Sequence, residues 1–140
     1  MKAGYHVTTD LLAIDHRAIW QWLHDASYWA AGRPWPVHER AVAGSRCFGV
    51  LAADGSTAAF ARVVTDGATF GWLADVVVLP DHRGQGLGKA LVDAVVSDPD
   101  LRVLRRLVLG TRDAHGLYEQ YGFRRDDRAR FMERLGEGDG

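Results

Sequence analysis

The stretch Leu79–Leu91, which reads LPDHRGQGLGKAL, constrains the fold of this 140-residue chain more than any other. Three consecutive β-branched residues, Val76, Val77 and Val78, precede it and favour a strand. Apolar residues within and after it recur at the spacing of one helix face: Leu87, Ala90, Leu91, Ala94 and Val95. The stretch therefore predicts a strand, a glycine-rich turn and a helix in immediate succession.

The turn carries glycines at alternate positions, Gly84, Gly86 and Gly88. Because glycine has no Cβ, the backbone can pass close to a ligand, and the free N–H groups at a helix N-terminus favour an anion. Arg83 adds a cation beside them. The pattern predicts a phosphate-binding turn, with an ordinary strand-to-helix connection as the alternative.

Two familiar nucleotide motifs do not fit this turn. A P-loop requires G-x-x-x-x-G-K-[ST], but Arg83 stands at its first glycine and Ala90 at its hydroxyl position. A Rossmann fingerprint requires G-x-G-x-x-G, whereas the three glycines here are spaced G-x-G-x-G. The spacing excludes both kinds of site.

The pattern R-x-x-G-x-G does fit, with Arg83, Gly86 and Gly88. It resembles the acetyl-CoA pyrophosphate motif of the GNAT superfamily of N-acetyltransferases. A second segment, Leu117–Phe123, is similar to the L-Y-x-x-x-G-F signature that closes the same fold. The two motifs occur in the family's order, and the resemblance extends over roughly residues 47–132.

The resemblance implies acetyl-CoA as the acyl donor. The strand before the turn would splay from its neighbour, and its main chain at Val76, Val77 and Val78 would hold the acetyl and pantetheine parts. The pyrophosphate would lie on the turn and the first residues of the helix: Arg83, Gly84, Gln85, Gly86, Leu87, Gly88 and Lys89.

Two residues are the expected catalytic groups. The resemblance implies that Tyr118 protonates the departing CoA sulfur, with Tyr121 on the same helix face as its substitute. Asp75 lies in an apolar run, where an unpartnered carboxylate is costly, so it is either the base that deprotonates the amine or a structural aspartate. His115 and a water molecule are the other candidate bases.

An aromatic loop with two prolines, residues 27–36, separates the first two predicted helices. Aromatic side chains in a loop either pack on the core or form a pocket wall, and the resemblance favours an acceptor site. The predicted acceptor-binding residues are Tyr28, Trp29 and Trp35 from this loop and Arg62, Phe70 and Trp72 from the central strands. Aromatic walls suit a small apolar or aromatic amine and also a cationic one.

The expected fold is α/β, with a mixed, mostly antiparallel central sheet flanked by helices. Strands are predicted at 5–9, 47–52, 58–64, 69–78 and 104–109, and helices at 16–24, 37–43, 88–97 and 114–121. Asp-Gly pairs at 54–55 and 66–67 predict hairpin turns, Asp15 and Asp113 are the expected helix caps, and Gly122 is expected to end the last helix. Residues 123–135 are expected to add a strand or hairpin. Residues 1–135 are expected to form one domain, and 136–140 a flexible tail.

Composition limits the possible partners. The net charge of −1 gives no field for nucleic acid or an anionic membrane, and no apolar run is long enough to span a bilayer. The single Cys47 favours a cytoplasmic setting, and the histidines and one cysteine suggest no metal site. We therefore expect an acetyl-CoA-dependent N-acetyltransferase acting on a small-molecule amine, with a homodimer possible. A non-catalytic acyl-CoA sensor or partner module is the alternative.

Overall fold

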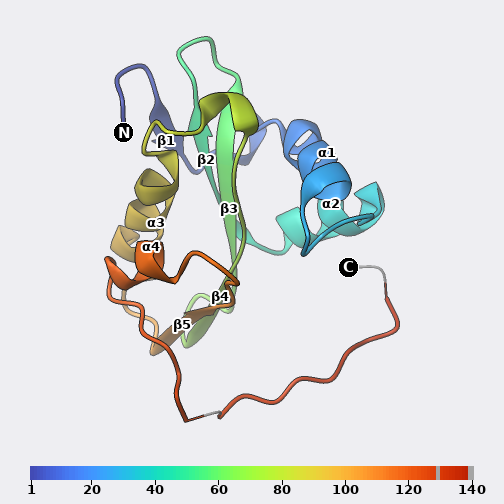
Figure 1. The fold of residues 1–140 in the computed structure, drawn as a ribbon, viewed down its shortest axis with the longest axis vertical. Coiled ribbons are helices and arrows are strands. Elements are labelled where there is room, and N and C mark those ends of the chain that lie inside the picture. Colours follow the sequence, from blue (N-terminus) through green and yellow to red (C-terminus); the bar gives the residue numbers. More distant parts are fainter. Residues whose placement is uncertain (129, 139–140) are drawn as a thin grey trace.

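The computed structural model describes residues 1–128 and 130–138. Five strands form one sheet in the order β1-β2-β3-β4-β5 (Figure 1). The strands are β1 (His6–Thr8), β2 (Arg46–Leu51), β3 (Thr57–Thr65), β4 (Phe70–Val78) and β5 (Arg106–Leu109). All neighbours are antiparallel except β4 and β5, which are parallel. The predicted mixed, mostly antiparallel sheet is confirmed.

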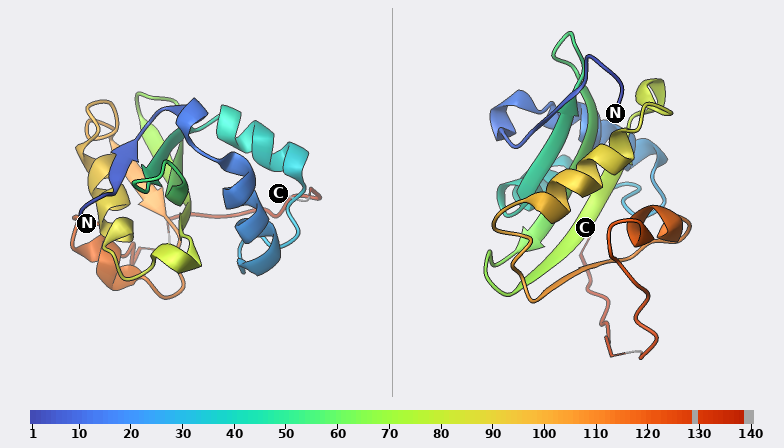
Figure 2. Two further views of the ribbon diagram at one scale, coloured as in Figure 1. Left: turned by 90° about the horizontal axis from the view of Figure 1, so that it is seen from above. Right: turned by 90° about the vertical axis from the view of Figure 1, so that its left-hand side faces the viewer.

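Helices cover both faces of this sheet (Figure 2). Helices α1 (His16–Ala26) and α2 (Trp35–Ala43) lie on one face, and α3 (Leu87–Ser97) and the short α4 (His115–Glu119) lie on the other. Short 3-10 turns, η1 (Leu11–Ala13) and η2 (Pro80–His82), precede α1 and α3. The flanking helices predicted from the sequence are therefore present.

Each face has its own hydrophobic core. On one face, Leu91 and Val95 of α3 are fully buried against Phe48 and Val63 of the sheet. On the other, Ile19 and Leu23 of α1 pack with Phe60 of β3. Full burial of an aliphatic or aromatic side chain contributes roughly 1.5–3 kcal/mol, so these contacts fix both helical layers on the sheet.

The local signals that predicted the hairpins and the first helix are confirmed. Gly55 and Gly67 have φ of +86° and +75°, the left-handed conformation that the second residue of an Asp-Gly turn requires. Asp15 caps α1, because its carboxylate accepts a hydrogen bond from the Ala18 N–H at 3.0 Å. Gly122, with φ of +88°, follows α4 as expected of a C-terminal glycine.

Three predictions of local structure are wrong. Helix α2 begins at Trp35 rather than at residue 37, because a proline is tolerated in the first turn of a helix and Pro36 lies there. Asp113 does not cap α4: the N-cap residue is Ala114, α4 has no side-chain cap hydrogen bond, and the Thr111 Oγ1 accepts from the Ala114 N–H at 3.0 Å.

The third wrong prediction is the last strand. Residues 123–128 and 130–135 form neither strand nor helix. They run as a largely exposed chain past β5 (Figure 1), where Arg106 lies 5.6 Å from the Phe131 ring centroid and Arg130 pairs locally with Asp126 at 3.3 Å. A segment with this many charged residues stays in solvent. Burying its unpaired charges against the sheet would cost more free energy than the burial of its few apolar side chains would gain. Of the predicted tail at 136–140, residues 136–138 are exposed and form neither helix nor strand, and 139–140 lie outside the described residues. Within the described part of the chain, no helix combines the length and apolarity needed to cross a membrane.

Candidate active site

Strands β4 and β5 separate part-way along the sheet. Their pairing ends at Leu73 and Leu109, whereas β4 stays paired with β3 as far as Val78. Over residues 74–78 the β5-facing edge of β4 therefore has no strand partner among the described residues. Such an edge presents N–H and C=O groups that need partners from solvent or a ligand. Val76, Val77 and Val78 lie on this open edge, and their side chains pack into the two cores.

The glycine-rich turn follows the open edge directly. Gly84 and Gly86 have φ of +78° and +79°, and Gly86 is the N-cap residue of α3. Both glycines are exposed, and nothing lies within 4 Å of a Cβ built on Gly84. The turn therefore presents backbone rather than side chains at the start of a helix, where anions bind.

The remaining residues of the turn differ in what they present. Arg83 donates from Nε to the Val78 carbonyl at 3.1 Å, and its guanidinium lies 5.6 Å from the Trp22 ring centroid. Leu87 as a whole residue is only 1% exposed and belongs to the hydrophobic core, so it anchors the start of α3. The Gln85 carbonyl accepts from the Lys2 N–H at 3.2 Å, and Lys89 is exposed.

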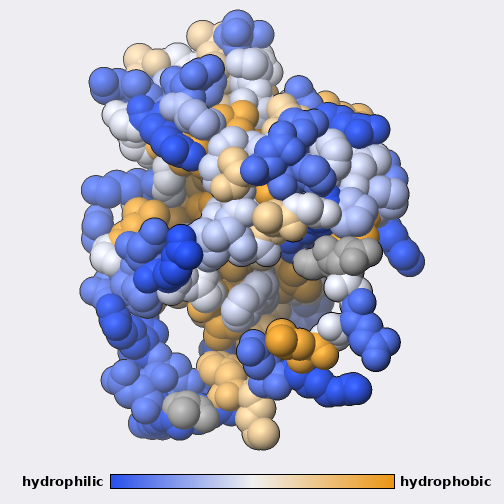
Figure 3. All heavy atoms as spheres, turned by 45° about the vertical axis from the view of Figure 1, so that its right-hand side comes forward, coloured by the Kyte–Doolittle hydropathy of each residue, from blue (hydrophilic) through white to orange (hydrophobic). Residues whose placement is uncertain are grey.

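A cleft of about 760 Å³ opens between β4, the loop after α1 and the β5–α4 loop. We call it the central cleft. It brings together most of the predicted acceptor and catalytic residues, namely Tyr28, Trp29, Arg62, Trp72, Asp75 and Tyr118, and also Val76 of the predicted donor site. In the space-filling view, hydrophobic atoms show through a hollow with hydrophilic residues around it (Figure 3).

Two predicted acceptor residues lie elsewhere. Trp35 packs on Trp20 with ring centroids 5.7 Å apart and does not line the central cleft. Arg17 lies over its ring at 4.1 Å. Phe70 lines a neighbouring hollow that also contains Trp72, His115 and Tyr118. The first turn of α2 thus directs Trp35 toward α1 instead of toward the sheet.

Asp75 is the centre of a buried ionic network. Its Oδ2 accepts from Arg33 Nη1 and from Arg62 Nε, both at 2.7 Å. Its Oδ1 accepts from Trp29 Nε1 at 2.9 Å and from Arg33 Nη2 at 3.3 Å. The Asp75 side chain is only 1% exposed. The network ties the loop between α1 and α2 to the middle of the sheet.

The backbone of β4 directs Asp75 into this network. The β3–β4 register shifts between Phe60 and Arg62, so that Asp75 and Val76 oppose the single Ala61 in a β-bulge. Asp75 has φ of 51°, the one left-handed non-glycine among the described residues. Aspartate tolerates this conformation better than most residues. The bulge re-aims the carboxylate toward Arg33, which sequence reasoning did not connect with it.

Charge and burial set the proton affinities around the network. Burial raises the pKa of Asp75, but the hydrogen bonds and charges of Arg33 and Arg62 outweigh it and hold the pKa below the usual value. His38 is fully buried beside Arg33, and burial lowers its pKa to about 4. Asp75 is therefore ionised and His38 neutral at physiological pH.

Tyr118 lines both the central cleft and the neighbouring hollow. Its ring packs edge-on against Phe123 at 5.8 Å, and only 8% of the residue is exposed. Burial, together with Tyr28 nearby, raises the pKa of its hydroxyl. The group thus stays protonated at neutral pH and can donate a proton. His115 lies one turn earlier on α4 and lines the neighbouring hollow.

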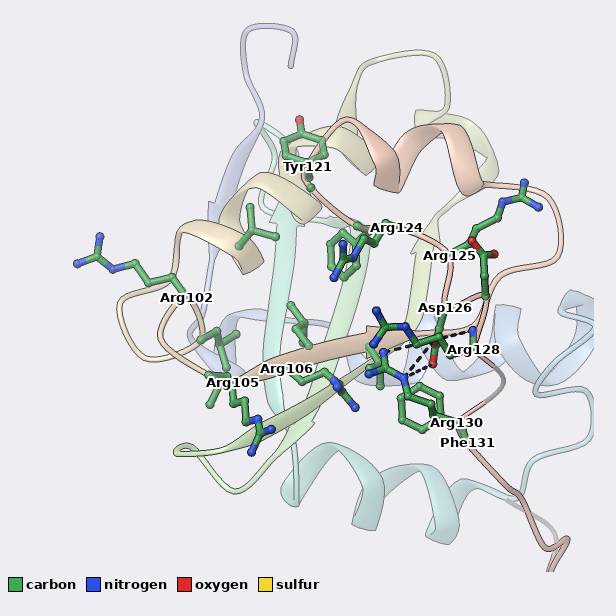
Figure 4. Close-up of a pocket in the computed structure, with 18 residues that line it drawn as sticks. Arg102, Arg105, Arg106, Tyr121, Arg124, Arg125, Asp126, Arg128, Arg130 and Phe131 are labelled. Atoms are coloured by element: carbon green, nitrogen blue, oxygen red, sulfur yellow. Dashed lines mark hydrogen bonds and ion pairs between the residues drawn. The ribbon is translucent and has the colours of Figure 1, made fainter.

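A separate hollow of about 680 Å³ lies between β5 and the C-terminal segment (Figure 4). It is lined by Arg102, Arg105 and Arg106 near β5 and by arginines of the C-terminal segment, and it shares no lining residue with the central cleft. Tyr121, the expected substitute for Tyr118, lies here instead of in the central cleft. Apart from Tyr121, no predicted site residue lines this hollow.

Comparison with known proteins decides the family. The profile described as "Acetyltransferase (GNAT) domain" matches residues 44–125, more than half of the chain. The chain belongs to the GNAT family of acetyltransferases. A presumed acetyltransferase of Gibberella zeae is 31% identical over 139 residues, covering 84% of this chain and 77% of that protein. A crystal structure of a presumed GNAT acetyltransferase from Xanthomonas campestris is 47% identical with a TM-score of 0.90, covering 94% of this chain and 93% of that one.

A third similarity covers only part of this GNAT chain. The ribosomal protein bS18 alanine N-acetyltransferase of Escherichia coli is 38% identical over 79 residues, about half of each protein.

Three residues of the central cleft, Trp22, Arg33 and Arg112, were not predicted from the sequence. Thr111, Arg112 and Asp113 stand ahead of α4, where the resemblance to GNAT proteins leads one to expect an asparagine, so this departure was visible in the sequence. Trp22 and Arg33 carried no such signal.

Proposed function

We propose that this GNAT protein transfers an acetyl group from acetyl-CoA directly to the amine of a small molecule. The observation that carries the proposal is the open edge of β4, which lies between the glycine-rich turn and Tyr118. In this arrangement the pyrophosphate lies on Gly84–Gly88, and the thioester arm pairs with the free backbone groups of residues 74–78. Preorganised backbone donors of this kind orient a thioester and stabilise charge as it develops.

The chemical step then needs an acid at the sulfur. The amine nitrogen attacks the thioester carbonyl carbon, the C–S bond breaks, and its electron pair goes to the sulfur. Tyr118 gives its hydroxyl proton to this thiolate, and its raised pKa keeps that proton available. No covalent bond to the enzyme forms.

The geometry of Asp75 argues against the base role that the sequence suggested. Both carboxylate oxygens are hydrogen-bonded to arginines, and only 1% of the side chain is exposed. A carboxylate with a lowered pKa is a poor proton acceptor. We assign to Asp75 the structural role of holding Arg33 and Arg62. The proton of the attacking amine then goes to water or to His115, the two remaining candidate bases.

The cellular setting is part of the proposal. Burial raises the pKa of Cys47 to about 11, so the thiol stays unreactive and suits the cytoplasm. Residues 1–135 would act as one domain. The outer edge of β5, unpaired among the described residues, is where a homodimer would form.

The test is release of free CoA from acetyl-CoA across a panel of amines, polyamines, amino acids and aminoglycosides. We expect Tyr118→Phe to lower kcat by about 10–100-fold with little change in KM, as expected for the loss of a general acid. Tyr121→Phe is the matched control, because Tyr121 lies outside the central cleft. Tight acetyl-CoA binding without CoA release for any amine, and no effect of Tyr118→Phe, would favour the sensor function instead.

A further inference from the structure

The central cleft carries an excess of positive charge. Three arginines line it, Arg33, Arg62 and Arg112, against two aspartates, Asp75 and Asp113. Asp75 is sealed beneath the first two arginines and shows a ligand almost no surface. A molecule entering the cleft therefore meets three guanidinium groups and one exposed carboxylate, that of Asp113 next to Arg112.

Arg62 keeps part of its binding capacity. Its Nε donates to Asp75, and its Nη1 donates to the Ser45 hydroxyl at 3.1 Å. Among the described residues, Nη2 has no hydrogen-bond partner, while the side chain remains 12% exposed in the cleft. A guanidinium fixed by two partners is preorganised, so little further side-chain entropy is lost when a ligand binds it.

Arg112 is positioned at the rim by stacking. Its guanidinium carbon lies 3.7 Å from the Tyr28 ring centroid, within the range of a cation–π contact. Stacking occupies the face of the guanidinium and leaves its in-plane N–H donors free, the geometry that matches a carboxylate.

The same contacts disfavour a cationic acceptor. An aromatic cage holds a cation through its ring faces. Here Arg112 already lies over Tyr28, and Arg83 lies 5.6 Å from the Trp22 ring centroid. The protein's own cations thus occupy two of the five aromatic rings of the cleft.

We propose that the acceptor is an amine that also bears a carboxylate, an α-amino acid with an apolar or aromatic side chain, and that Arg62 and Arg112 bind this carboxylate. Trp29 and Trp72, two of the three rings of the cleft without a cation of the protein over them, would hold the side chain. This inference rests on the proposed acetyl transfer, and it names a class of acceptor that the shared donor site does not determine.

The first test compares phenylalanine with phenylalaninamide in the CoA-release assay. The amide has the less basic amine and would react faster on reactivity alone, so preference for the acid reports recognition of the carboxylate. We expect kcat/KM to be about 10–100-fold higher for the acid, the effect of one or two charge-assisted hydrogen bonds. Equal or reversed preference would overturn the proposal while leaving the acetyltransferase activity standing.

A binding measurement makes the test independent of turnover. Calorimetry with N-acetylphenylalanine and its amide should show tighter binding of the acid even if no transfer is detected. Arg112 is exposed, so Arg112→Gln should fold normally. It should leave the affinity for acetyl-CoA unchanged and weaken the binding of N-acetylphenylalanine by about tenfold. Arg62→Lys should weaken it as well, and Arg102→Gln in the separate hollow should change nothing. Loss of acetyl-CoA affinity in Arg112→Gln, or equal binding of acid and amide, would contradict the assignment.

Discussion

Replacing Asp75 with asparagine separates a structural carboxylate from a catalytic one. Asparagine has nearly the same shape and tolerates the left-handed φ of 51° at this position, so the backbone cost is unchanged. The substitution removes the charge and places an amide N–H₂ against arginine N–H donors. Arg33 and Arg62, with side chains 7% and 12% exposed, would then share a buried site without a counter-charge.

The expected loss of stability is large. Removing one partner of a buried ion pair costs ~3–5 kcal/mol, and the hydrogen bonds that asparagine can still accept favour the lower end. With an unfolding entropy near ~2.1 cal/mol/K per residue, ~3 kcal/mol lowers the Tm of a chain of this size by ~10 °C. Urea unfolding followed by circular dichroism gives the free energy, and a thermal scan gives Tm.

Asp93→Asn provides the matched control. Asp93 is exposed on α3, so its substitution should stay within ~0.5 kcal/mol of the parent protein. If Asp75→Asn also stays within ~0.5 kcal/mol and yet abolishes acetyl transfer, Asp75 is the base and the account of the network is wrong.

Two further predictions concern the glycine turn and the buried histidine. Gly86→Ala should weaken acetyl-CoA binding by about tenfold in calorimetry. A left-handed alanine costs ~1–2 kcal/mol, and its Cβ would lie 3.3 Å from the Met1 nitrogen. Gly116→Ala is the control, because a Cβ at this position of α4 meets nothing within 4 Å, and it should leave acetyl-CoA binding unchanged. In the folded protein His38 has a pKa of about 4 and is neutral, whereas in the unfolded chain it takes up a proton near pH ~6.5. The free energy of unfolding should therefore be highest above pH ~6.5 and fall by ~3 kcal/mol as the pH is lowered to 4. Urea unfolding at several pH values measures this dependence. The free energy of unfolding should change less with pH in His38→Gln than in the parent protein, and as much as in the parent protein in the exposed His6→Gln. The same pH dependence in both variants would refute the assignment.

Local chemistry made the fold largely predictable. The Asp-Gly pairs required left-handed glycines and so fixed two hairpins, and the alternating glycines after a valine run fixed the turn before α3. The start of α2 was missed because proline was taken as a loop residue, although the first helical turn tolerates it. For the charged segment after residue 123 the error was to predict a strand that does not form. Its residue spacing allowed a strand, but its charges keep it in solvent.

The site was less predictable, because its contacts join residues distant in sequence. Asp75 stood out as a charge in an apolar strand, yet its partners Arg33 and Arg62 lie 42 and 13 residues away. The bulge that aims it at Arg33 left no mark in the sequence. Trp35 was placed in the acceptor site because it lies in an aromatic loop for which the resemblance favours that role, and only the packing of α2 on α1 shows that it points elsewhere. Motif spacing identifies the donor half of a site, whereas the acceptor half depends on tertiary contacts.

Hydrogen exchange with and without acetyl-CoA tests the central claim most directly. Backbone amides at the open edge of β4 and in the glycine turn lack strand partners in the free protein and should exchange fast. We predict that acetyl-CoA slows exchange in peptides covering residues 74–91 and leaves the β2–β3 hairpin, residues 46–65, unchanged. Binding of acetyl-CoA with no protection at residues 74–91, or with protection confined to the arginine-lined hollow of Figure 4, would contradict the account.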